Sequence, residues 1–151
     1  MSRCFYKLLN LYTYYSRRAF YLLSIAYSEA SIQKVPDCKK KLHTKAIQNH
    51  PLREKLAVEV LFAKAQSVQD PAYTCDLERK AFGYVNIPPG GPTPTFGNNV
   101  VYSEGLGRLN LEKVIGEWKA KLQKMGRKTK FGCNLKLSLN PTSYKIACVF
   151  R

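Results

Sequence analysis

The side chains best suited to metal binding or nucleophilic chemistry in this 151-residue chain are two histidines, His43 and His50, and five cysteines. No Cys-x-x-Cys pair occurs, which argues against zinc-ribbon and thioredoxin-like sites. The acidic residues are dispersed, and the chain has neither a Gly-x-Ser-x-Gly elbow nor a glycine-rich phosphate loop. The sequence therefore predicts that the protein is not an enzyme, and it predicts no catalytic residue, bound metal or cofactor.

The net charge is the second chemical feature, with 25 basic and 10 acidic residues giving +15. Such a charge permits binding to nucleic acid, anionic lipid or sulfated polysaccharide through a long-range field. The basic residues are scattered, and the densest unbroken run is Lys39 to Lys41. No RNP, KH or zinc-finger pattern accompanies them. A basic intracellular protein that binds RNA or DNA is therefore kept as the alternative interpretation.

Residues 1–30 have the composition of a secretory signal peptide. Arg17 and Arg18 precede a mostly apolar stretch over residues 19–27, which ends at Ser28-Glu29-Ala30. The alternative is an amphipathic N-terminal helix of the mature protein. No apolar run is long enough for a membrane span, so none is expected.

The cysteine count agrees with a signal peptide, because cleavage near Ala30 removes Cys4 and leaves four cysteines. Four cysteines suit a secreted domain with two disulfides. The alternative is five reduced thiols packed as small apolar side chains in a cytosolic protein.

The remaining chain predicts three helices followed by two strands. Apolar spacing and turn residues place helices over residues 36–49 and 52–68, a loop over 70–99 and a third helix over 111–125. Asn110 is the expected N-cap of the third helix and Gly126 its C-terminal stop. Strands are expected over residues 131–139 and 144–150, with a turn at 140–143.

Four stretches of this chain resemble the CAP superfamily of cysteine-rich secretory proteins, venom allergens and plant pathogenesis-related proteins. The resemblance covers residues 36–151 and implies an α+β fold, a CAP-like α-β-α sandwich with a reduced antiparallel sheet. It is carried by Leu42-His43-Thr44, by Pro51-Leu52 with the segments 55–57 and 63–66, by 96–100 with Trp118, and by the Gly-Cys of 132–133 with the Tyr-x-x-x-Cys of 144–148.

The same resemblance implies a disulfide pattern. In that family the Gly-Cys cysteine pairs with the cysteine of the last strand, which here gives Cys133 with Cys148. Cys75 stands at the family's Cys-x-Leu position, but Ser138 occupies the place of its usual partner. The expected second pair is therefore Cys38 with Cys75.

Many CAP domains hold a divalent metal between two histidines and two glutamates, and this chain departs from that pattern. Arg79, Asn98 and Lys121 stand at three of the four positions, and most of the segment that carries the last histidine is missing. Two cations at such a site would repel a metal ion, so no metal is expected and the three residues are candidates for an anion or ligand cleft. His43 is expected to have a structural, hydrogen-bonded role.

These observations together predict a secreted, extracellular, non-catalytic CAP-like domain with a binding, defence or host-interaction role. Its partner is expected to be an extracellular ligand, with lipid or sterol and anionic glycan as the candidate classes.

Overall fold

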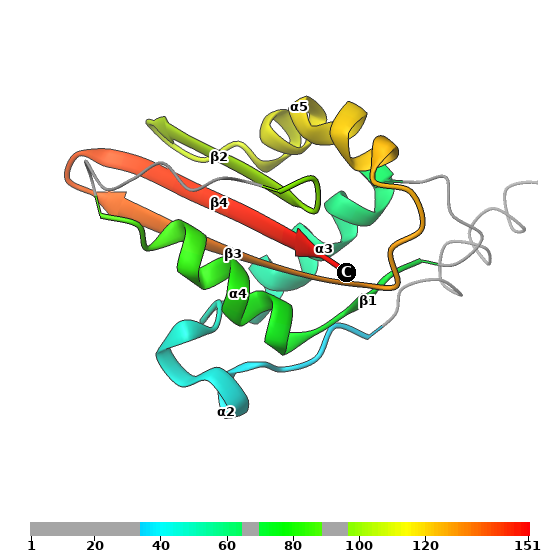
Figure 1. Cartoon of the computed structure of the whole chain (residues 1–151). Coiled ribbons are helices and arrows are strands. Elements are labelled where there is room, and N and C mark those ends of the chain that lie inside the picture. Colours follow the sequence, from blue (N-terminus) through cyan, green and yellow to red (C-terminus); the bar gives the residue numbers. More distant parts are fainter. Residues whose placement is uncertain (1–33, 65–69, 89–96) are drawn as a thin grey trace, which may run out of the picture. The chain divides into compact units, whose positions relative to one another are not determined.

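The computed structural model describes residues 34–64, 70–88 and 97–151 (Figure 1). The predicted signal peptide and Cys4 lie outside the described residues. The described chain forms an α-β-α sandwich, in which α4 covers one face of a four-stranded sheet and α3 and α5 cover the other. This is the predicted fold class.

The sheet is built around a long hairpin of β3 (Lys130–Leu139) and β4 (Thr142–Phe150). These are the two strands that the sequence predicts, slightly extended at their ends. Two further strands were not predicted: β2 (Val100–Leu106) pairs antiparallel with β4, and the short β1 (Ala72–Tyr73) pairs parallel with β3. The strand order is β1-β3-β4-β2, so the sheet is mixed rather than purely antiparallel.

Alternation along β4 divides the core between the two faces. Ile146, Cys148 and Phe150 face the cluster that includes α3 and α5, whereas Ala147 and Val149 face α4. The approach of α4 to β3 is so close that a Cβ on Gly132 would lie 2.7 Å from the carbonyl oxygen of Thr74 and still nearer to other backbone atoms of α4. A glycine at this position therefore allows the layer to form.

The helices α3 (His50–Lys64) and α5 (Leu111–Lys124) lie near the predicted positions. The Asn49 side chain accepts a hydrogen bond from the Leu52 amide, so that α3 begins two residues earlier than expected. In α5, Asn110 accepts from the Lys113 amide, and Gly126 adopts a left-handed φ of 63° just beyond the helix end. Both caps of α5 are as predicted.

The predicted helix over residues 36–49 is wrong. The structure has a single short helix, α2 (Lys39–Leu42), and a 3₁₀ turn, η1 (His43–Lys45). His43 has a positive φ of 50°, which interrupts the helix. Beyond it, the backbone of Ile47 makes its hydrogen bonds with two buried side chains instead of with helical neighbours. The apolar stripe is nevertheless buried as expected, at Cys38, Leu42, Ala46 and Ile47.

The expectation that residues 70–99 are mostly loop is wrong for 72–85, which contain β1 and α4 (Cys75–Val85); residues 89–96 of that range lie outside the described residues. Leu77, Ala81 and Val85 recur at four-residue spacing and form the buried face of α4. No helix of the described residues is long and apolar enough to cross a membrane.

Candidate functional site

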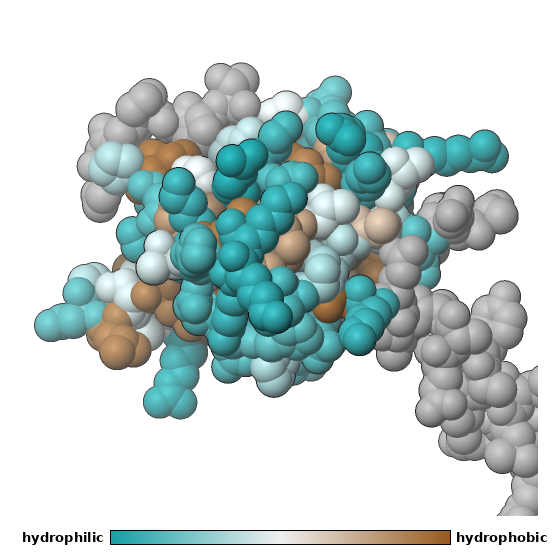
Figure 2. Space-filling model, turned by 90° about the horizontal axis from the view of Figure 1, so that it is seen from below, coloured by the Kyte–Doolittle hydropathy of each residue, from teal (hydrophilic) through white to brown (hydrophobic). Residues whose placement is uncertain are grey.

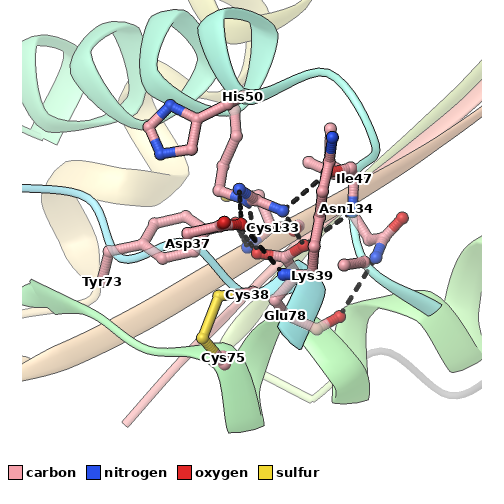
Figure 3. Close-up of polar contacts among 12 residues, drawn as sticks. Asp37, Cys38, Lys39, Ile47, His50, Tyr73, Cys75, Glu78, Cys133 and Asn134 are labelled. Atoms are coloured by element: carbon pink, nitrogen blue, oxygen red, sulfur yellow. Dashed lines mark hydrogen bonds and ion pairs between the residues drawn. A yellow bond between two sulfur atoms is a disulfide. The ribbon is translucent and has the colours of Figure 1, made fainter. Parts of the chain in front are cut away.

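A fully buried ion pair between Arg53 of α3 and Glu78 of α4 is the centre of the largest polar cluster that the structure describes (Figure 3). Arg53 Nε donates to Glu78 Oε2 at 3.0 Å, and Arg53 Nη2 donates to the carbonyl oxygen of Ile47 at 2.6 Å. Glu78 Oε1 accepts from the Ile47 amide at 2.7 Å. Asp37 lies at the edge of the cluster, with its Oδ1 atom 3.7 Å from Arg53 Nη1. The buried charges of Arg53 and Glu78 neutralise one another inside the protein.

Tyr73 of β1 connects this cluster to the sheet. Its hydroxyl lies 2.8 Å from Glu78 Oε2 and 3.0 Å from the carbonyl oxygen of Cys133, and it accepts from the Cys133 amide. Burial, and next the neighbouring Glu78 carboxylate, raise the pKa of Tyr73 well above its ordinary value. The hydroxyl therefore stays protonated and serves as a hydrogen-bond bridge between α4 and β3.

The side-chain amide of Asn134 is the last member of the cluster. It donates to the carbonyl oxygen of Lys45 at 2.9 Å and to that of Glu78 at 3.4 Å. Together these contacts join residues 37–53, α4, β1 and β3. Because the side chains are hydrogen-bonded mainly to one another and to the backbone, the arrangement is that of a structural network.

Both disulfides of the described chain lie around this network. Cys38 is bonded to Cys75 and Cys133 to Cys148, which are the two pairs that the resemblance implies. The first joins the start of α2 to the start of α4, and the second joins directly opposed residues of β3 and β4. The first bridge therefore links two helical segments, and the second links two neighbouring strands within the sheet.

The structure does not bring the three residues of the predicted cleft together. Arg79, Asn98 and Lys121 are all exposed, on α4, before β2 and on α5 respectively. Because α4 and α5 cover opposite faces of the sheet, Arg79 and Lys121 do not share a cleft. Within residues 34–64, 70–88 and 97–151, no three histidine, cysteine or acidic side chains are grouped as metal ligands would be. Two cations and an amide do not fit the CAP metal centre.

Neither histidine belongs to a group of potential metal ligands within the described residues. The His43 side chain is exposed and forms no hydrogen bond within the described residues, which corrects its expected hydrogen-bonded role. It acts instead through its backbone, whose carbonyl oxygen accepts from Gln48 and from the Ala46 amide. His50 is half-buried and lies 3.4 Å from Glu54 in the first turns of α3.

A groove of about 580 Å³ lies at the other end of the sheet, where the β3–β4 hairpin meets the first turns of α3 and α5. We call it the hairpin-end groove. Its walls are mainly apolar, and the charged side chains of Lys55, Arg108 and Glu112 line it as well. Its lining residues are Leu52, Lys55, Gly107, Arg108, Leu109, Asn110, Leu111, Glu112, Leu137, Ser138, Leu139, Thr142 and Ser143.

Exposed leucines surround this end of the sheet. Leu137 and Leu139 of β3 are 53% and 90% exposed, and Leu106 at the end of β2 is 83% exposed. Figure 2 views the face that carries α2 and α4, and it shows a mostly hydrophilic surface with hydrophobic side chains gathered toward the hairpin end. The groove had no signal in the sequence, because its lining comes from three separate segments.

Comparison with known proteins gives the chain a family. Residues 38–150 match the family described as Ancylostoma-associated secreted protein related. One similar solved structure is entitled "Manganese-bound Ac-ASP-7"; it is 17% identical to this chain, covers 71% of each chain and superposes with a TM-score of 0.45. No curated protein sequence matches. Since the matched segment covers most of the chain and includes every helix and strand of the described residues, the chain belongs to the Ancylostoma-associated secreted protein related family, which is of the CAP type.

Proposed function

We propose that this chain is a secreted, non-catalytic CAP-type domain that binds an extracellular ligand. The observation that carries the proposal is the pair of disulfides, Cys38–Cys75 and Cys133–Cys148. Such bridges form and persist in oxidising compartments and are rare in the cytosol. The family description, which includes the word "secreted", agrees with this assignment.

The hydrogen bonds of the buried polar side chains support the proposal that the domain is not catalytic. The buried Arg53, Glu78 and Tyr73 are hydrogen-bonded to one another and to the backbone, so that they stabilise the packing of α3, α4 and the sheet. At the family's metal positions, Arg79 and Lys121 are exposed cations. If the domain acts by binding, its ligand would contact the protein surface, and the hairpin-end groove is one candidate contact region.

The proposal is tested by expressing the full chain in a secreting eukaryotic cell and measuring the intact mass of the product. We expect a protein in the medium that has lost about thirty N-terminal residues, as a cleaved signal peptide would. A Cys4→Ser variant is the matched control. It should give the same mature mass, because the proposed cleavage removes residue 4.

A non-reduced tryptic map of the same product tests the disulfides. Cleavage after lysine and arginine predicts one linked pair of peptides, 131–136 with 146–151, and a second pair, 35–39 with 65–79. A full-length product that stays in the cell with five free thiols would contradict the proposal. That outcome would favour the intracellular nucleic-acid-binding alternative, which is then measured directly with RNA and DNA.

A further inference from the structure

The second half of α5 and the segment that follows it carry a dense group of basic side chains. Between Trp118 and Phe131 the chain has six cations and no carboxylate. Five of them are exposed and Lys128 is half-buried. We call this group the α5 basic surface; its members are Lys119, Lys121, Lys124, Arg127, Lys128 and Lys130.

No member of this group forms an ion pair within the described residues, whereas three cations elsewhere, Lys41, Arg53 and Lys145, do. Lys41 pairs with Asp76 at 3.1 Å, and Lys145 lies 3.7 Å from Glu104. None of the six members of the α5 basic surface takes part in any of the ion pairs that the described part of the chain forms. The nearest carboxylate along the chain is that of Glu117, exposed one turn before Lys121 on α5, so the group presents a net positive charge to the solvent.

The pKa of the buried Lys64 of α3 is sensitive to the charge of one member of this group. Its ammonium donates to the carbonyl oxygen of Gly126, at the end of α5, at 2.7 Å. Burial is the main cause that lowers the pKa of Lys64, and the positive charge of Lys128 lowers it further. The charge of Lys128 thus acts on Lys64 in addition to burial, while the carboxylate of Asp70 acts in the opposite direction.

Stabilisation of the helix end accounts for only part of this group. Lysines in the last turn of α5 interact favourably with the negative end of the helix dipole, an effect that falls off within one turn. Arg127, Lys128 and Lys130 lie beyond the helix, and Lys130 begins β3. The cations therefore extend along the chain from α5, through the loop, to the start of β3, a succession that suits a linear ligand with repeated negative charges.

The apolar side chains next to these cations indicate which class of polyanion the surface suits. The large apolar side chains between the cations of this segment, Leu122 and Met125, are buried, as is Trp118 before them, so the segment itself offers neither an aromatic ring for stacking on bases nor an apolar group to insert into a membrane. We propose that the α5 basic surface binds a linear sulfated polysaccharide. This inference rests on the proposed function, because such polymers are extracellular partners.

The test compares two triple variants that lose the same charge. The first, Lys119→Gln/Lys121→Gln/Lys124→Gln, removes half of the α5 basic surface. The matched control, Lys39→Gln/Lys40→Gln/Lys45→Gln, removes three exposed lysines from α2 and η1.

Binding of each protein to heparin is measured by titration over a range of salt concentrations, with chemically desulfated heparin as the second probe. We expect the first variant to bind heparin about tenfold or more weakly and the control to change by about twofold or less. Only lysines that contact the polyanion displace its counterions, so only their loss should weaken binding strongly. The slope of log K against log salt should fall by roughly two in the first variant.

Three outcomes would overturn the inference. They are equal losses in both variants, equal binding of desulfated heparin, and tighter binding to RNA or to vesicles of anionic phospholipid than to heparin. Each of them leaves the proposed function standing, because the mass and disulfide measurements involve no heparin. Conversely, a chain retained in the cell with free thiols would contradict the proposed function whatever its affinity for heparin.

Discussion

Replacing one partner of the buried Arg53–Glu78 pair should destabilise the protein far more than replacing both. Glu78→Gln keeps the shape of the side chain and removes its charge. The carboxylate accepts hydrogen bonds from Arg53, from the Ile47 amide and from the Tyr73 hydroxyl. A neutral amide has one acceptor oxygen and brings two donors into a site where the Arg53 guanidinium and the Ile47 amide can only donate. The only carboxylate left beside the buried Arg53 guanidinium among the described residues would then be that of Asp37, which is half-exposed and lies 3.7 Å from Nη1.

The size of the effect can be estimated from the 3.0 Å separation of Arg53 Nε and Glu78 Oε2. At an effective dielectric constant of about 20, the attraction between unit charges at that distance is about 5 kcal/mol. The desolvation of each ion is of a similar size, so the intact pair contributes little net stability. Loss of one partner leaves the other ion's desolvation uncompensated, and we expect Glu78→Gln to lower the free energy of unfolding by about 3–5 kcal/mol.

The double variant Arg53→Met/Glu78→Leu separates this mechanism from a simple loss of contacts. Since both charges are removed together, its free energy of unfolding should be higher than that of Glu78→Gln, with a coupling energy of about 2 kcal/mol or more in the double-mutant cycle. Urea unfolding with both disulfides intact, followed by far-UV circular dichroism, measures each value. If Glu78→Gln lowers the stability by less than about 1 kcal/mol, or if the single effects add, the pair is not a buried, coupled ion pair and the reasoning is refuted.

Three further predictions concern the packing and the ionisation of the described residues. Gly132→Ala should lower the free energy of unfolding by about 3 kcal/mol or more, measured by urea unfolding, because its new Cβ would collide with backbone atoms of α4. The pKa of Tyr73 is raised above the ordinary 10.0, so the stability that it contributes is complete below about pH 10 and is lost as the pH rises further; Tyr73→Phe should flatten that alkaline part of the stability curve. The hydrogen bond and charge of Lys41 lower the pKa of Asp76, so Lys41→Gln should raise that pKa in a carboxyl NMR titration, whereas Lys40→Gln should not.

The sequence predicted those elements whose local pattern and tertiary environment agree. In α5 the apolar stripe, the Asn110 cap and the Gly126 stop all indicate one helix, and the structure has that helix. Over residues 36–49 the pattern identified the buried residues but not the conformation, because the Ile47 backbone is bonded to Arg53 and Glu78. Tertiary contacts of this kind are not visible in a local window.

The buried network was missed for a related reason. Arg53 and Glu78 are 25 residues apart, so nothing in the local sequence indicates that they meet. A weak signal existed, since each charge lies on the apolar face of its helix, Arg53 three residues before Leu56 and Glu78 three residues before Ala81. A charged residue at such a position must be paired when it is buried. The hairpin-end groove had no comparable signal.

The departures from the family pattern and the proposed polysaccharide surface meet at one residue. The resemblance places a glutamate where this chain has Lys121, and the structure places Lys121 within the α5 basic surface. A lysine there cannot act as the carboxylate ligand of a cation, but it extends a run of cations that contains no acidic residue. The same substitution thus removes a carboxylate that could hold a metal and adds a positive charge, which the proposed polysaccharide surface would use. If the α5 basic surface is functional, the loss of the metal ligands and the gain of positive charge are two results of one change in ligand class.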